Sequence, residues 1–186
     1  MAKPHIYIVH GYTASVDSNW FPWLKTTLEN KGITTTVLPM PESHNPNDEA
    51  WLAYLKNNIT ISKNTILVGH SLGCIAILKY VEQLPITQKI RGVVLVSGFA
   101  EKVDTLPELD QFNQNPTNYH DLIIKIQTRI VIASLNDEIV PYHYSERLKE
   151  RLQAEYYTLQ NGGHFLDRDG FSEFPLVYEQ ITKITN

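Results

Sequence analysis

Short apolar runs alternate with amphipathic segments along the whole chain. The runs are rich in β-branched and aromatic residues, and several are apolar throughout instead of alternating with polar residues. Parallel strands that are covered on both faces have this pattern. It predicts strands over residues 6–9, 34–38, 65–68, 92–96, 130–133 and 155–159.

The segments between these runs have the periodicity of helices. Trp20, Trp23, Leu24 and Leu28 fall on one helical face, and Asn47 is a good N-cap for a helix that follows it. Segment 98–126 breaks the rhythm with scattered Pro, Asn and Asp residues, and only a short helix is expected near 121–126. The pattern predicts further helices over 20–30, 48–57, 72–83, 143–153 and 174–184.

This alternation predicts a single-domain α/β protein. Alternating strands and helices favour a three-layer fold with a parallel sheet between two helical layers. We expect about six mostly parallel strands in the order 2-1-3-4-5-6. The chain has 186 residues, 42% of them hydrophobic, which suffices for one core and is short for two. Residues 1–186 are therefore predicted to form one domain.

Composition narrows the classes of partner. Sixteen Lys and Arg residues against 20 Asp and Glu give a net charge of −4, without the basic surplus that nucleic acids select, so no nucleic-acid partner is expected. No apolar stretch approaches the ~20 residues of a membrane span. The single cysteine, Cys74, excludes a disulfide framework and a Cys-rich zinc site. The N-terminal apolar run is too short for a secretory signal, so a cytoplasmic location is expected.

The sequence Gly69-His70-Ser71-Leu72-Gly73 matches the G-x-S-x-G pattern. It stands between an apolar strand and an amphipathic helix, the setting of a nucleophile elbow. Such a turn forces the serine into a strained backbone conformation, and side chains two residues before and after it would collide with its surroundings. The alternative is that Ser71 is only a helix cap. A cap does not require both glycines, so we favour Ser71 as a nucleophile.

A serine nucleophile needs a base and an acid, which in this fold follow it in the order Ser, Asp or Glu, His. His164 lies in the glycine-rich loop after the last predicted strand, where a positioned imidazole is expected. Asp137 follows strand 130–133 and is the best candidate for the acid, with its neighbour Glu138 as the alternative. A role for Asp137 in an Asx turn is the simpler structural explanation.

An oxyanion hole needs two backbone donors. One should be the N–H of Leu72, directly after the nucleophile, and the other should come from the loop after the first strand. In that loop Gly11 permits close approach, Tyr12 is the first candidate donor and Thr13 the next. The predicted strand order places both loops at the switch point of the sheet, so they should flank one crevice.

Five motifs together carry a family resemblance. HGYTAS, GHSLGC, LVSGF, SLNDEIVPY and NGGHF occur in this order between Ile6 and about Tyr178. The set resembles the small serine hydrolases of the YdeN type, relatives of retinoblastoma-binding protein nine within the α/β-hydrolase superfamily. The resemblance implies a reduced α/β-hydrolase fold with Ser71 as nucleophile, Asp137 as acid and His164 as base.

The substrate site is expected to be small. Any lid is confined to segment 98–126, which favours an open site for small esters. Gly11, Tyr12, Phe99 and Phe165 are the candidate substrate-binding residues; Phe112 is a further aromatic candidate, and ordinary core packing is the alternative for each aromatic ring. No metal or cofactor is expected.

The leading hypothesis is therefore a serine hydrolase that cleaves small carboxylic esters through an acyl-enzyme. An amidase or aminopeptidase with the same triad shares this route. A third hypothesis, from another class, is a protein-binding module with a vestigial triad. Only a small-molecule ester or amide is expected as partner, and the sequence leaves the oligomeric state open, a monomer included.

Overall fold

A six-stranded parallel sheet forms the centre of the molecule. The computed structural model describes residues 3–186, so residues 1 and 2 of the predicted domain lie outside the described part. The strands run in the order β2-β1-β3-β4-β5-β6 with parallel pairing throughout, which confirms the predicted fold class and strand order. The strands are β1 (His5–Val9), β2 (Thr34–Leu38), β3 (Thr65–His70), β4 (Ile90–Val96), β5 (Ile126–Ser134) and β6 (Glu155–Leu159).

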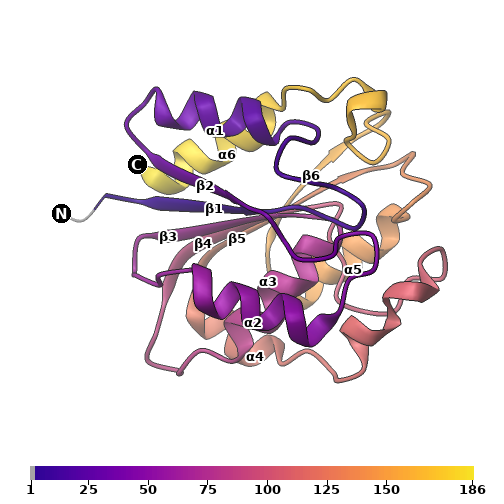
Figure 1. Ribbon diagram of the computed structural model, residues 1–186, viewed down its shortest axis with the longest axis horizontal. Helices are drawn as coiled ribbons and strands as arrows, with labels where there is room; N and C mark the ends of the chain where they lie inside the picture. The colour runs from indigo at the N-terminus through magenta and orange to yellow at the C-terminus, as the bar shows by residue number, and fades with distance from the viewer. Residues whose placement is uncertain (1–2) are drawn as a thin grey trace.

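Helices cover both faces of this sheet. On one face lie α1 (Phe21–Glu29) and α6 (Pro175–Thr185), side by side above the strands in Figure 1. The other face carries α2 (Asp48–Asn58), α3 (Leu72–Glu82), α4 (Tyr119–Lys125) and α5 (Tyr142–Leu152). Two 3-10 helices, η1 (Pro107–Asn113) and η2 (Asp167–Asp169), lie in connections.

Among the described residues, none of the helices has the length and apolar character needed to cross a membrane.

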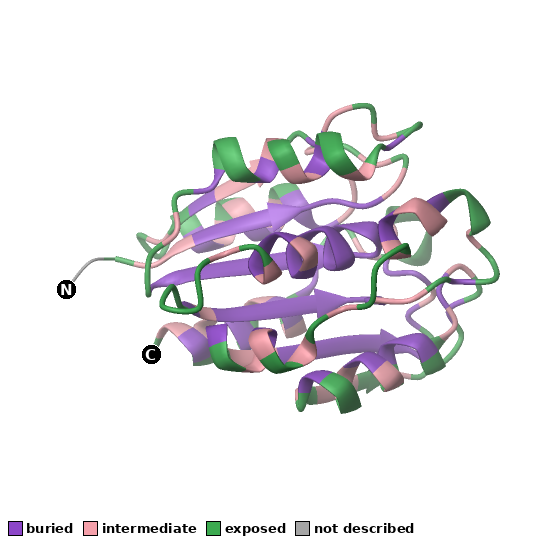
Figure 2. Cartoon of the chain, turned by 90° about the horizontal axis from the view of Figure 1, so that it is seen from below, coloured by how far each residue is buried: buried purple, intermediate pink, exposed green. Residues whose placement is uncertain are grey.

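The two helical layers give the sheet two hydrophobic cores. Ile6 and Ile8 of β1 pack in the core beneath α1 and α6, whereas Tyr7 and Val9 belong to the core shared with α2 and α3. The central strands are buried along most of their length (Figure 2). Because both faces are covered, both sets of alternating side chains are apolar. This explains why the strands read as continuous apolar runs.

The predicted elements lie where expected, with changes at their ends. The strand predicted at 130–133 is longer, Ile126–Ser134, because its polar first half still pairs with β4, as Gly92 does with Thr128. Within segment 98–126 the short helix is α4, and η1 precedes it. Asn47 caps α2 as predicted, accepting a hydrogen bond from Ala50 N at 2.9 Å.

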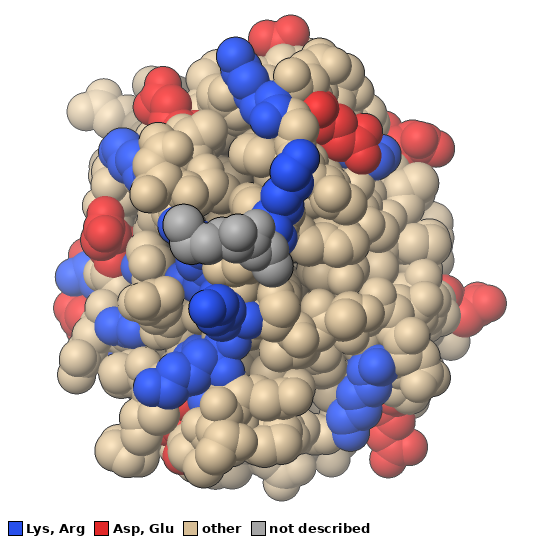
Figure 3. Space-filling model, turned by 90° about the vertical axis from the view of Figure 1, so that its left-hand side faces the viewer, with Lys and Arg blue, Asp and Glu red and all other residues tan. Residues whose placement is uncertain are grey.

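Basic side chains gather at the edge where the strands begin. Lys63, Lys89, Arg91 and Arg129 line a groove there, and Figure 3 shows this side of the molecule. The arginines have structural partners. Arg91 donates to the carbonyls of Ile184 and Thr185 and Arg129 to those of Leu152 and Gln153, which end α6 and α5. Cations at helix C-termini are stabilising, so these contacts account for the two guanidinium groups.

A buried lysine anchors the C-terminal end of α3. The Lys125 side chain is only 2% exposed, and its Nζ donates to Glu82 O at 2.7 Å and to Val81 O at 3.4 Å. The carboxylate of Asp121 lies 3.8 Å away. These two carbonyls belong to the last turn of α3, where Val81 O also accepts from Leu84 N at 3.1 Å and Lys125 supplies the donor for Glu82 O. Lys125 therefore fixes the end of the helix whose first residue follows Ser71.

We predict that Lys125→Met lowers the free energy of unfolding by about 1–3 kcal/mol, because the Glu82 carbonyl loses its donor and the Val81 carbonyl loses one of its donors. Urea unfolding followed by circular dichroism measures the change. Lys56→Met, at an exposed position on α2, is the matched control and should stay within about 0.5 kcal/mol of the wild type. Equal stability of the two variants would contradict the anchoring role.

Candidate active site

Ser71 occupies a strained turn between β3 and α3. Its backbone has φ 54° and ψ −119°, a conformation that residues with a Cβ rarely adopt. Ser71 stands at the N-cap position of α3, yet its side chain makes no capping hydrogen bond. The capping alternative from the sequence is thus not what the structure presents.

Both glycines of the motif are sterically required. A Cβ atom on Gly73 would lie 2.1 Å from the carbonyl oxygen of Val9, in β1. A Cβ atom on Gly69 would lie 2.9 Å from the backbone N and Cα of Cys74. Backbone atoms cannot easily yield at such distances, so only glycine lets α3 begin this close to β1 and to the end of β3.

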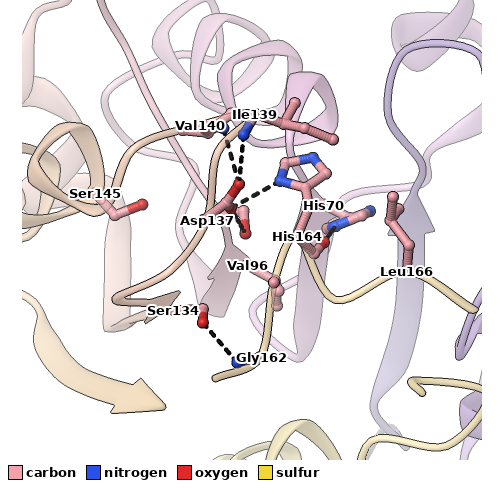
Figure 4. Close-up of polar contacts among 12 residues, drawn as sticks. His70, Val96, Ser134, Asp137, Ile139, Val140, Ser145, Gly162, His164 and Leu166 are labelled. Atoms are coloured by element: carbon pink, nitrogen blue, oxygen red, sulfur yellow. Dashed lines mark hydrogen bonds and ion pairs between the residues drawn. The ribbon is translucent and has the colours of Figure 1, made fainter. Parts of the chain in front are cut away.

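A carboxylate and an imidazole meet next to this turn. Asp137 follows β5, His164 follows β6, and His164 Nδ1 lies 2.8 Å from Asp137 Oδ2 (Figure 4). Both side chains are buried. The neighbouring Glu138 is exposed and makes no hydrogen bond with the ring of His164. Of the two candidate acids, the structure therefore pairs Asp137 with His164.

Four hydrogen bonds hold the Asp137 carboxylate. Its Oδ1 accepts from the backbone N–H groups of Ile139 at 2.9 Å and Val140 at 3.0 Å. Its Oδ2 accepts from Ser97 Oγ at 2.9 Å in addition to His164. The turn of residues 137–140 fits the predicted Asx geometry, so Asp137 serves the loop and the imidazole together. Sequence reasoning missed Ser97, whose only signal is its place directly after an apolar strand.

Ser71 and His164 line the same cavity. This cavity has a volume of about 470 Å³ and opens at the carboxyl ends of the strands. Within residues 3–186 no hydrogen bond is made by Ser71 Oγ. Catalytic hydrogen bonds often form fully only with substrate bound. Besides Ser71 and His164, the wall includes Gly11, Tyr12, Thr105, Leu106, Ile139 and Leu166.

The loop after β1 lies directly against the turn at Ser71. A Cβ atom on Gly11 would stand 3.1 Å from Ser71 Cβ and 3.7 Å from the nitrogen of Leu72. The N–H of Thr13 is already committed, since it donates to Ser43 O at 2.8 Å. Of the two candidate donors in this loop, Tyr12 and Thr13, only Tyr12 therefore remains a candidate, and its role with Leu72 stays a prediction.

Two buried histidines support these loops in their neutral form. His10 donates from Nδ1 to Gly11 O at 2.9 Å and accepts from Met40 N at Nε2, and burial lowers its pKa. His70 donates from Nε2 to the backbone oxygen of His164 at 2.8 Å. Burial, and then the charge of nearby His164, lowers the pKa of His70 to about 3. These contacts give both rings a structural role, and the sequence did not predict that of His70.

Three of the aromatic candidates for substrate binding lie in the hydrophobic cores and not at the cavity. Phe99 and Phe165 are 1% and 0% exposed and belong to the two hydrophobic cores. Phe165 stacks on Phe174 with ring centroids 4.8 Å apart. Core packing, the alternative reading, therefore holds for both, and also for the buried Phe112. Gly11 and Tyr12, in contrast, line the cavity as predicted.

Neither a thiol nor a metal site adds to this chemistry in the described part of the chain. Cys74 is fully buried, and burial raises the pKa of its thiol. Its Sγ donates to Val96 O at 3.4 Å. No group of three or more His, Cys, Asp or Glu side chains among residues 3–186 is arranged to hold a metal ion.

Comparisons with known proteins agree with this geometry. A family model described as serine hydrolase matches residues 6–183. The YdeN protein of Bacillus subtilis (strain 168) is 43% identical over 178 residues, covering 95% of this chain and 94% of the relative. The crystal structure of the ydeN gene product superimposes with a TM-score of 0.96 over 98% of both chains. Serine hydrolase RBBP9 of Rattus norvegicus is 23% identical over 165 residues, covering 88% and 87%.

The neutral His70 predicts a loss of stability in acid. Its pKa is about 3 in the folded protein and near the ordinary ~6.5 when unfolded, so between these values the unfolded chain binds the extra proton. Stability should therefore rise with pH through this window, by up to about 1.4 kcal/mol per pH unit from this group. His70→Gln keeps a donor for His164 O and removes the titration.

Urea unfolding of the wild type and His70→Gln at pH 5, 6 and 7 measures this dependence. The wild type should lose more stability on acidification than the variant does, while carboxylates contribute equally to both. Parallel pH dependences for the two proteins would contradict a neutral, buried His70.

Proposed function

The chain belongs to the serine hydrolase family, and from that premise we propose that it cleaves small carboxylic esters with Ser71, His164 and Asp137. One observation carries this proposal. The strained Ser71 shares a cavity with an imidazole whose other nitrogen is bonded to a buried carboxylate. A serine hydroxyl needs such a base and such an orienting acid to become nucleophilic at neutral pH.

The first half of the reaction forms an acyl-enzyme. Asp137 holds the proton of His164 on Nδ1, which leaves Nε2 free to accept the proton of Ser71. Ser71 Oγ attacks the ester carbon, the carbonyl electrons move to the oxygen, and the N–H groups of Leu72 and Tyr12 stabilise the oxyanion. His164 then gives the proton to the departing alcohol, and Asp137 stabilises the imidazolium in between.

Water completes the cycle. His164 takes a proton from a water molecule, whose oxygen attacks the acyl carbon, and the same donors hold the second oxyanion. Return of the proton to Ser71 releases the carboxylic acid and restores the enzyme. Placement of Leu72 at the start of α3 supports its role, because the first N–H groups of a helix lack intrahelical partners.

The form of the cavity supports small esters as substrates. About 470 Å³ is at the lower end of ligand sites. The large buried aromatic rings lie in the cores and add no apolar tunnel to it. Its wall instead mixes threonine and serine side chains with a few aliphatic ones. A compact acyl group fits such a wall better than a long alkyl chain.

We predict that Ser71→Ala abolishes labelling by a fluorophosphonate probe and lowers kcat by about 10⁴–10⁶-fold, because no other group can take the acyl group. Labelling on gels and ester hydrolysis measure the two effects. Ser145→Ala, which removes a different buried serine hydroxyl, should retain labelling. Full activity of Ser71→Ala would remove the proposal, and a wild type that never labels would favour a binding module instead.

For substrate preference, we predict that kcat/KM for acetyl and butyryl esters exceeds that for dodecanoyl esters by about tenfold or more, because the few aliphatic side chains of the small cavity cannot bury a long chain. A series of p-nitrophenyl esters measures this, and aminoacyl amides in the same panel test the amidase alternative. Faster cleavage of amides than of matched esters would contradict ester preference without affecting the triad.

A further inference from the structure

Two neighbouring strands of the sheet are each followed by a buried serine with a positive φ. Ser71 follows β3 with φ 54°, and Ser97 follows β4 with φ 49°. Each donates its backbone N–H to the adjacent strand, Ser71 to Val96 O and Ser97 to Ile132 O, both at 2.9 Å. The turn after β4 therefore shares with the turn at Ser71 a positive φ and a backbone hydrogen bond to the adjacent strand.

The hydroxyl of Ser97 reaches the proposed acid. Ser97 is 1% exposed, and its Oγ donates to Asp137 Oδ2 at 2.9 Å. The same oxygen accepts the proton of His164 Nδ1 at 2.8 Å. We infer that Ser97 is a positioning residue that fixes Asp137 Oδ2 in line with the imidazole of His164. This inference rests on the proposed function, because the imidazole is the base of that reaction.

The division of contacts on the carboxylate explains why a fourth donor matters. Oδ1 is held by the N–H groups of Ile139 and Val140, which belong to the same loop as Asp137. Oδ2 is held from outside this loop only, by Ser97 and His164. Without Ser97, the direction of Oδ2 would depend on the imidazole that it is meant to orient. Ser97 directly follows the central strand β4, so its hydroxyl can hold that oxygen in a fixed position.

The strained backbone at position 97 also supports a functional role for Ser97. Glycine takes a φ of 49° without steric cost, whereas any residue with a Cβ is disfavoured there. If the residue at this buried turn had no function, glycine would give the more stable protein. The position carries a serine whose hydroxyl bonds to a catalytic carboxylate, and local strain of this kind commonly marks functional sites.

A pair of variants separates the hydroxyl from the backbone strain. Ser97→Ala removes the hydroxyl and keeps the strain, and Ser97→Gly removes both. Ser145→Ala is the matched control: Ser145 is also fully buried, but its hydroxyl donates to the backbone oxygen of Gly98 at 2.7 Å and does not contact Asp137. All three are assayed for kcat and KM with a short-chain ester, and for thermal unfolding.

We expect kcat to fall about tenfold in both Ser97 variants, the effect of one hydrogen bond to a charged group, with KM within about twofold of the wild type. Ser97→Gly should unfold at a higher temperature than Ser97→Ala, yet be no faster. Ser145→Ala should keep a wild-type kcat. Recovery of kcat in Ser97→Gly would assign the effect to strain, and a wild-type kcat in both variants would show that the hydroxyl is dispensable; either result overturns the inference.

A measurement without substrate separates this inference from the proposed function. The proton between His164 Nδ1 and Asp137 Oδ2 is followed by nitrogen-edited NMR of labelled imidazole. Its resonance should shift upfield and exchange faster with water in both Ser97 variants, and stay unchanged in Ser145→Ala. An unchanged resonance in the Ser97 variants overturns the positioning role. Failure of the wild type to cleave esters or react with fluorophosphonate refutes only the proposed function.

Discussion

The site depends on one close approach, that of the first turn of α3 to the end of β1. The space between Gly73 and the Val9 carbonyl leaves no room for a side chain, and the reversal at Ser71 sets the helix into that space. This contact holds the loops after β1 and β3 against each other at the switch point of the sheet. Residues of both loops consequently line one cavity next to the serine hydroxyl.

The remaining parts are brought together by polar contacts between loops that are far apart in sequence. Ser134 Oγ accepts from Gly162 N (Figure 4). Asn136 Oδ1 accepts from Gly163 N, so the ends of β5 and β6 are joined directly. Asp169 then accepts from the N–H of His164. Each contact satisfies a backbone donor near the imidazole. The loops after β5 and β6 are therefore ordered by hydrogen bonds between them as well as by the packing of buried Phe165.

The sequence predicts this architecture well because its information is local. Continuous apolar runs indicate strands that are covered on both faces, and β2 and β6 begin and end where expected. The elbow is recognisable because strand, two glycines and helix are contiguous. Contacts between the ends of different strands cannot be predicted from local sequence. Ser97 and His70 act on residues far along the chain, and no spacing rule relates a hydroxyl at 97 to a carboxylate at 137. The prediction that Phe99 and Phe165 bind substrate was wrong because proximity in sequence to the site does not determine whether a ring points into the cavity or into the core.

The edge of the cavity formed by Thr105 and Leu106 belongs to the least regular segment of the chain. Polar contacts fasten this stretch to the region around α5, from Thr105 to the carbonyl of Ile139 and from Asp104 to the hydroxyl of Tyr144. The carboxylate, the imidazole and the serine are held by other contacts. Changes in the length of the chain around residues 100–106 would accordingly alter the shape of the pocket, whereas Ser97, at the start of the same connection, must keep its place for its contact with Asp137.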